Sequence, residues 1–70
     1  MKPAEFEFVT NHIIESIVEY LMEDYNMPMA EAFDTIYNSA TYQKIKNKNT
    51  GLYRYSPAYN YEFLKQEMIN

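Results

Sequence analysis

The chain contains one histidine, His12, which is the first residue to consider as the centre of a chemical site. Glu15 and Glu19 follow it at helical spacing, so an imidazole and two carboxylates share one face. Metal sites in helical bundles use a Glu-x-x-His motif, with further glutamates pointing inward from other helices. Here the order is His-x-x-Glu and the face is polar, which favours a solvated helix surface. We therefore predict no metal ion and no cofactor.

The residue types that other kinds of catalysis require are scarce. There is no cysteine, and no serine or threonine has a second histidine to activate it. The single glycine is too few for a phosphate-binding loop. The sequence therefore predicts a protein that is not an enzyme.

Tyrosine is the unusual feature of the composition, since there are eight and six of them fall between residues 37 and 61. A tyrosine ring buries apolar area while its hydroxyl still needs a partner, so tyrosine suits half-buried positions and interfaces. One interpretation is a protein-binding surface, and the alternative is the rim of a small core. The side chains predicted to form the interface are Phe8, Met22, Tyr42, Tyr53, Arg54, Tyr55, Tyr59 and Tyr61.

The net charge of −4 is distributed unevenly. Residues 1–40 carry eight acids and one lysine, whereas residues 41–56 carry cations and no acid. Cations and rings in segment 42–55 suggest an alternative function, a nucleic-acid-associated regulator. Four positive charges on an acidic protein give little affinity from counterion release, so a protein partner is the preferred hypothesis. The predicted basic patch comprises Lys44, Lys46, Lys48 and Arg54.

The longest element that must position these residues is a helix predicted at about residues 4–24. Its apolar residues cover an arc of about 180°, which is wide enough for two neighbouring helices, and its other face is acidic. Phe8 and Met22 fall on the acidic side, where no neighbour within the chain is expected. These two side chains therefore join the predicted interface.

Three shorter helices are expected to pack on the first, which predicts an all-α fold. Pro28 disfavours a helical residue before it and suits the start of the next helix. A single helix from there to Lys46 would point Tyr42 away from the buried face, so a break is expected near Ser39. The shorter helices are predicted at about residues 28–38, 40–48 and 57–68.

Several residues carry local signals for helix ends and turns. Ser39 and Ser56 are predicted N-caps, and Pro57 follows Ser56 at the first position of the last helix. Gly51 is expected to adopt a positive φ. Residues 52–55 are predicted to be extended or irregular, and a short strand there would have no obvious partner.

Seventy residues suffice for one helical domain, residues 1–70. A chain of this size buries only about 60% of its unfolded surface, and without cysteine no disulfide can reinforce it. Self-association as a homodimer is therefore an expected alternative to a different protein partner. No export signal is visible and charges interrupt every apolar run, so we expect a cytoplasmic protein that does not bind membranes.

The C-terminal half carries the pattern TIYNSATYQKI followed by NTGLYRYSPAYNYEFLKQE. It resembles a group of short, uncharacterised bacterial proteins that share N-S-x-x-Y-x-K, then T-G-L-Y, then S-x-x-Y and a leucine–glutamate end. The resemblance implies a protein partner, because such proteins are suspected members of small toxin–antitoxin-like gene pairs, and it transfers no catalytic residue. The predicted function is thus a non-enzymatic protein–protein interaction module, in an antitoxin-like role. The matching positions are Asn38, Ser39, Tyr42, Lys44, Thr50, Gly51, Leu52, Tyr53, Ser56, Tyr59, Leu64 and Glu67.

Overall fold

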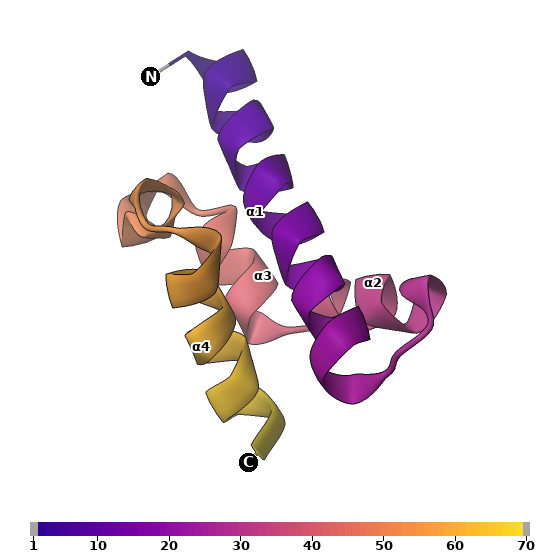
Figure 1. The fold of residues 1–70 in the computed structure, drawn as a ribbon. Helices are drawn as coiled ribbons and strands as arrows, with labels where there is room; N and C mark the ends of the chain where they lie inside the picture. The colour runs from indigo at the N-terminus through magenta and orange to yellow at the C-terminus, as the bar shows by residue number, and fades with distance from the viewer. Residues whose placement is uncertain (1, 70) are drawn as a thin grey trace.

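The computed structural model describes residues 2–69, and its longest element is the helix α1, Pro3–Tyr25 (Figure 1). Pro3 lies in the first turn, where the N–H that proline lacks would have no partner within the helix. The helix ends at Asn26, whose φ of 55° is left-handed. Asparagine tolerates this conformation better than most side chains, so α1 stops without a glycine. The predicted long N-terminal helix is confirmed.

The prediction of an all-α fold with three shorter helices is also confirmed. Ser39 caps one of them, because its Oγ accepts a hydrogen bond from the Tyr42 N–H at 3.0 Å. Ser56 caps another in the same way, accepting from the Tyr59 N–H at 3.1 Å. Both predicted caps are therefore present. The three helices are α2 (Met29–Tyr37), α3 (Ala40–Ile45) and α4 (Pro57–Ile69).

Helix α3 is shorter than the predicted 40–48 because it ends at Ile45. The Asn47 side chain accepts a hydrogen bond from the Asn49 N–H at 3.0 Å, which opens the short 3₁₀ helix η1, Lys48–Thr50. Asparagine side chains compete in this way with the helical backbone. The α-helical hydrogen bonding of α3 therefore ends before Lys48, which belongs to η1.

Of the extended or irregular forms expected for residues 52–55, the structure has an extended backbone at Tyr55 alone and no strand in this segment. Leu52–Arg54 form a second 3₁₀ helix, η2, in which the Tyr55 N–H donates to the Leu52 carbonyl at 3.1 Å. Gly51 connects the two short helices with a φ of 72°, as predicted. This left-handed residue turns the chain inward, so that Leu52 is buried instead of lying along a strand.

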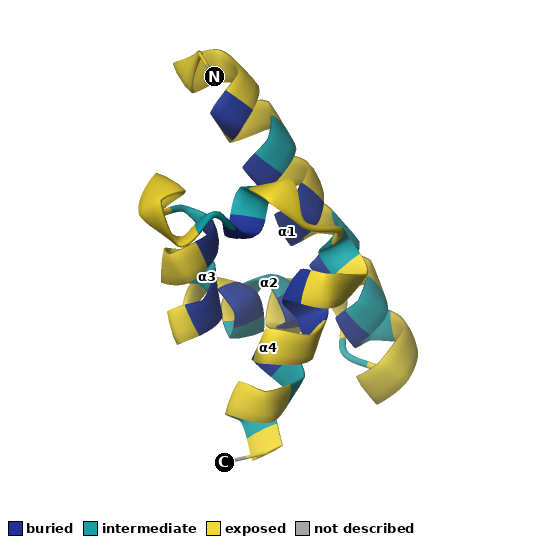
Figure 2. Cartoon of the chain, turned by 90° about the vertical axis from the view of Figure 1, so that its left-hand side faces the viewer, coloured by how far each residue is buried: buried dark blue, intermediate teal, exposed yellow. Residues whose placement is uncertain are grey.

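The hydrophobic core lies where α1 meets α2 on one side and α4 on the other, and α3 packs against α4. Figure 2 shows the buried residues on the faces that the helices turn toward one another. The two neighbours account for the wide apolar arc of α1, and each large apolar side chain contributes about 1.5–3 kcal/mol. Within residues 2–69, no helix combines the length and apolarity needed to cross a bilayer. The largest apolar side chains that are fully buried are Ile13, Ile17, Leu21, Ile36, Ile45 and Leu64.

Candidate interaction surface

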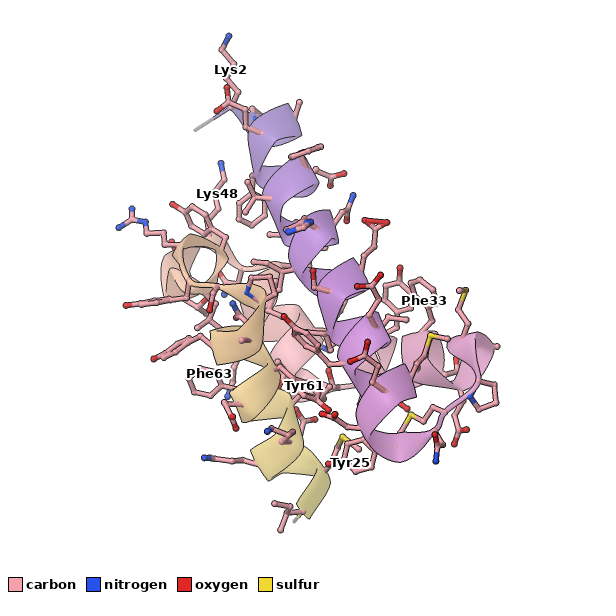
Figure 3. All side chains as sticks on the ribbon, in the orientation of Figure 1. Lys2, Tyr25, Phe33, Lys48, Tyr61 and Phe63 are labelled. Carbon is pink, nitrogen blue, oxygen red and sulfur yellow. The ribbon has the colours of Figure 1, made fainter. Side chains whose placement is uncertain are left out.

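Three aromatic rings form a continuous row at the start of α4 and along its outer side. The rings of Tyr55 and Tyr59 stack with centroids 4.5 Å apart, and Tyr59 meets Phe63 edge to face at 5.3 Å. They remain 51%, 46% and 38% exposed, respectively. Within α4 the spacing of four residues places Phe63 one turn after Tyr59, whereas Tyr55 lies before the helix. We call Tyr55, Tyr59 and Phe63 the aromatic ladder, and Figure 3 shows Phe63 on the side of α4 away from α1.

A buried asparagine holds the chain that carries the aromatic ladder. Asn60 is fully buried, and its Nδ2 donates to the carbonyls of Leu52 at 3.1 Å and Ser56 at 3.0 Å. A third, longer contact of 3.4 Å reaches the Tyr55 carbonyl. Within the described residues the Asn60 Oδ1 has no hydrogen-bond partner. The amide therefore ties η2 and the first turn of α4 together directly beneath the ladder.

The sequence reasoning did not identify Asn60 as a structural residue. The available signal was its spacing, because Asn60 lies four residues before Leu64 on the face of α4 that is buried. A polar residue on such a face needs hydrogen-bond partners, and here they are backbone carbonyls.

The prediction that Tyr61 belongs to the interface is wrong. Tyr61 is only 5% exposed, and its ring lies 5.0 Å from the Tyr20 ring, between α4 and α1 (Figure 3). Its hydroxyl donates to Asp24 Oδ2 at 2.8 Å. Burial, and then the hydrogen bond to this carboxylate, raise the pKa of Tyr61 above its ordinary value of 10.0. The side chain can be buried because Asp24 satisfies its one polar group.

Met22 was also predicted in the interface, and the structure places it against the core instead. Its unbranched thioether can bend from the edge of the acidic face toward apolar neighbours. Phe8, by contrast, is 76% exposed in the second turn of α1, distant in sequence from the ladder. Tyr42 and Tyr53 are half-buried, with edge contacts to Tyr37 at 5.1 Å and to Phe6 at 5.2 Å.

Three of the four side chains in the predicted basic patch contact other side chains of the chain itself. Lys46 Nζ donates to Thr10 Oγ1 at 3.0 Å and to Asn11 Oδ1 at 2.9 Å, which joins the end of α3 to α1. Lys48 lies over the Phe6 ring at 5.3 Å, and Arg54 lies over the Tyr53 ring at 5.5 Å. Lys44 is exposed. Lys46 and Lys48 thus contact α1, whereas Arg54 contacts its neighbour Tyr53 within η2.

Glu67 is a second residue whose role the sequence did not reveal. Its carboxylate accepts hydrogen bonds from the Ala40 N–H at 2.7 Å and from the Thr41 N–H at 3.0 Å, at the start of α3. The Thr41 hydroxyl donates to it as well, at 2.7 Å. Burial opposes the charged form, but these hydrogen bonds outweigh it and hold the pKa of Glu67 below 4.5. Glu67 therefore fastens the end of α4 to α3, across 26 residues of sequence.

A groove of about 250 Å³ lies between α1 and α2. Its lining comprises Asn11, Ile14 and Glu15 from α1 with Phe33 and Tyr37 from α2. Ile14 is buried, whereas Asn11, Glu15 and Tyr37 are exposed and form the rim. The Phe33 and Tyr37 rings lie nearly parallel, 5.8 Å apart. The groove thus combines two aromatic rings with one carboxylate.

No metal-binding cluster of three or more histidine, cysteine or acidic side chains occurs among residues 2–69. His12 is exposed on the outer face of α1. Comparisons with protein-family models, with curated proteins and with solved structures found no match.

Proposed function

We propose that this protein is a non-enzymatic protein–protein interaction module that binds its partner through the aromatic ladder. The observation that carries the proposal is the row of Tyr55, Tyr59 and Phe63, in which each ring contacts the next and yet each residue is more than one third exposed. Small proteins rarely leave contiguous apolar patches open to water unless something binds there. Tyrosine is also enriched among the residues that dominate binding energy.

The ladder is suited to binding because its rings are already ordered. Tyr59 stacks between its two neighbours, and Asn60 fixes the backbone beneath them. A partner therefore meets a surface whose side chains lose little conformational freedom on association. This ordering supports a binding role, because each residue also keeps more than one third of its surface exposed.

The partner that we propose is either a second copy of this chain or a different protein. A second copy is favoured by the small core of a chain of 70 residues. A different protein is favoured by the resemblance of the C-terminal half to members of small gene pairs, in which this chain would take the antitoxin-like role. We place the module in the cytoplasm because it has no cysteine, as is common in reducing compartments.

Sedimentation of the wild type and of Tyr59→Ala tests the ladder first as a homodimer contact. Tyr25→Ala is the matched control, because Tyr25 and Tyr59 are both 46% exposed and Tyr25 lies outside the ladder. A dimer held by the ladder persists in high salt, because apolar contacts are not screened, and is weakened at least about tenfold by Tyr59→Ala alone.

If the wild type is monomeric at low and at high salt, the wild type, Tyr59→Ala and Tyr25→Ala are each used as baits on lysate of the source cell. The captured protein is then purified and titrated against each bait. The proposal requires a loss of affinity in Tyr59→Ala that Tyr25→Ala does not share. Equal affinities for the two variants, or no binding protein at all, would overturn it.

The alternative function, a nucleic-acid-associated regulator, has weaker support. Lys46, Lys48 and Arg54 are engaged with Thr10, Phe6 and other side chains of the chain. These contacts restrain three of the four cations, and four positive charges on a chain of net charge −4 give little affinity from counterion release. Binding to random DNA or RNA that weakens steeply as salt rises would favour this alternative.

A further inference from the structure

The groove between α1 and α2 lies on the other side of α1 from the aromatic ladder, as the positions of Phe33 and Phe63 in Figure 3 show. Its volume of about 250 Å³ is below the ~300–1,000 Å³ of sites for drug-sized ligands. A single side chain or a small organic ion fits this space better than a nucleotide or a peptide backbone.

The negative charge around the groove favours a positively charged ligand. Glu15 is exposed at the rim, and within residues 2–69 its carboxylate forms no ion pair or hydrogen bond. The whole of α1 carries six carboxylates and neither lysine nor arginine. A cation that enters the groove is therefore attracted by Glu15 directly and by the field of the helix around it.

The aromatic lining favours the same charge. Phe33 and Tyr37 line the groove with rings 5.8 Å apart, and Ile14 provides an apolar contact between the helices. The faces of such rings attract ammonium and guanidinium groups, while the rings also accept the methylene groups that carry them. Aromatic rings beside a carboxylate suit an alkylammonium or alkylguanidinium better than a neutral ligand of equal size.

One cation of the chain already marks one end of the groove. Lys46 Nζ binds Asn11 Oδ1 at 2.9 Å. Its positive charge repels a second cation at that end. Glu15 lies one helical turn farther along α1, so the ligand's charge belongs at the Glu15 end of the groove.

We propose that this groove binds the side-chain cation of a lysine or arginine carried by a protein partner. The proposal rests on the proposed function only in assigning the cation to a protein. The preference of the groove for a cation stands on its own lining. The aromatic ladder and the groove would then contact different parts of a partner, or different partners.

The test uses n-butylammonium and n-propylguanidinium as probes for the two side chains, with n-butanol as the neutral control. NMR titration follows the Ile14 methyl groups and the ring protons of Phe33 and Tyr37. We expect saturable shifts with both cations, with dissociation constants in the millimolar range that suits such small ligands. Butanol is expected to bind several-fold more weakly.

Glu15→Gln removes the charge of the groove, and Glu23→Gln removes one charge from the same helix two turns farther on. Glu15→Gln is expected to weaken binding of the cations about fivefold, as the loss of one close charge in water predicts. Glu23→Gln should change the affinity for the cations less than about twofold, because salt screens a charge two helical turns away from the groove.

Three results would overturn the proposal. The first is no saturable shift with either cation, and the second is butanol binding as tightly as butylammonium. The third is an equal effect of Glu15→Gln and Glu23→Gln, which would indicate general attraction to an acidic helix. Since Tyr59 is unchanged in every one of these proteins, failure here is distinct from failure of the aromatic ladder.

Discussion

Tyr59 and Tyr61 are two residues apart on α4, and each ring packs against another aromatic ring, yet they occupy opposite environments. Tyr61 meets Tyr20 in the core and is 5% exposed, whereas Tyr59 stacks in the ladder and is 46% exposed. The buried hydroxyl has a partner in Asp24 at 2.8 Å. A step of two residues turns a helix by about 200°, which places the two rings on different faces.

Tyr59 and Tyr61 show that contact between aromatic rings and burial of a ring are separate contributions to stability. Aromatic pairs of either kind contribute about 0.5–1.5 kcal/mol beyond the area they bury. Tyr61 adds to this the removal of nearly all its ring from water, whereas Tyr59 keeps almost half of its surface in contact with solvent. The two clusters therefore have different roles: the Tyr20–Tyr61 pair stabilises the fold, and the ladder remains available for binding.

The largest expected effect compares these two tyrosines directly. Tyr61→Ala should destabilise the protein by about 3–5 kcal/mol, because it leaves a cavity between α4 and α1. Tyr59→Ala should cost about 1 kcal/mol, the lower limit for two aromatic contacts of about 0.5 kcal/mol each, because both contacts lie on the surface. Urea unfolding measures both, with Tyr25→Ala as the exposed control. Equal losses for Tyr59 and Tyr61 would mean that the ladder is part of the structural core.

Substitution of Asn60, which lies between Tyr59 and Tyr61, should cause an intermediate loss of stability. Asn60→Ala removes the side-chain hydrogen bonds to the Leu52 and Ser56 carbonyls and should cost about 1–3 kcal/mol, because each of the two contributes about 0.5–1.5 kcal/mol. Urea unfolding measures the loss, and Asn49→Ala, at an exposed position, serves as the control. The variant should also loosen the ladder, which hydrogen exchange at the Tyr55 and Tyr59 amides can detect. Unchanged stability would show that Asn60 does not hold the two segments together.

The smallest loss of stability is expected for Glu67, near the C-terminal end of α4, and it should depend on pH. Glu67→Ala should cost about 1 kcal/mol near neutral pH, as the loss of a helix N-cap does. Because folding lowers the pKa of Glu67, the folded state favours the carboxylate, and its contribution is present above pH 4.5 and is lost as the pH falls through the lower folded value. The difference in stability between wild type and variant should therefore shrink in acid.

Unfolding curves of Glu67→Ala and the wild type from neutral pH to strongly acidic pH measure this dependence. Glu62→Ala is the control, because Glu62 pairs only with Lys65 on the surface, at 3.1 Å. Exposed ion pairs of this kind contribute little. A difference between Glu67→Ala and wild type that stays constant across the whole range would contradict the role of the ionised carboxylate.

Much of the secondary structure could be predicted from the sequence. The helical period of residues 6–25, the serine caps at Ser39 and Ser56, and the positive φ of Gly51 are local properties, and local properties follow from neighbouring residues. The conformation of residues 52–55, for which the sequence left extended and irregular forms open, depended on packing instead. The β-prone residues of this segment have a weak preference of their own, and the burial of Leu52 decided the conformation.

The candidate site was predicted only in part. Tyr55, Tyr59, Arg54 and Phe8 are exposed as expected, whereas Tyr61 is buried and Met22 packs against the core. Composition shows that tyrosine is abundant, but each tyrosine can serve as core or as surface, depending on whether its hydroxyl finds a partner. For Tyr61 that partner, Asp24, is 37 residues away in sequence.

The sequence by itself therefore determined that the chain is helical, where its helices start, and that one face of the long helix is apolar over an arc wide enough for two neighbours. The tertiary structure alone decided which tyrosine became core, that Lys46 joins α3 to α1, and that Glu67 caps α3 from the end of α4. The physical reason is the range of the interactions. Helical periodicity and capping act within a few residues, whereas each of these contacts depends on a partner that only the packing of the helices brings near.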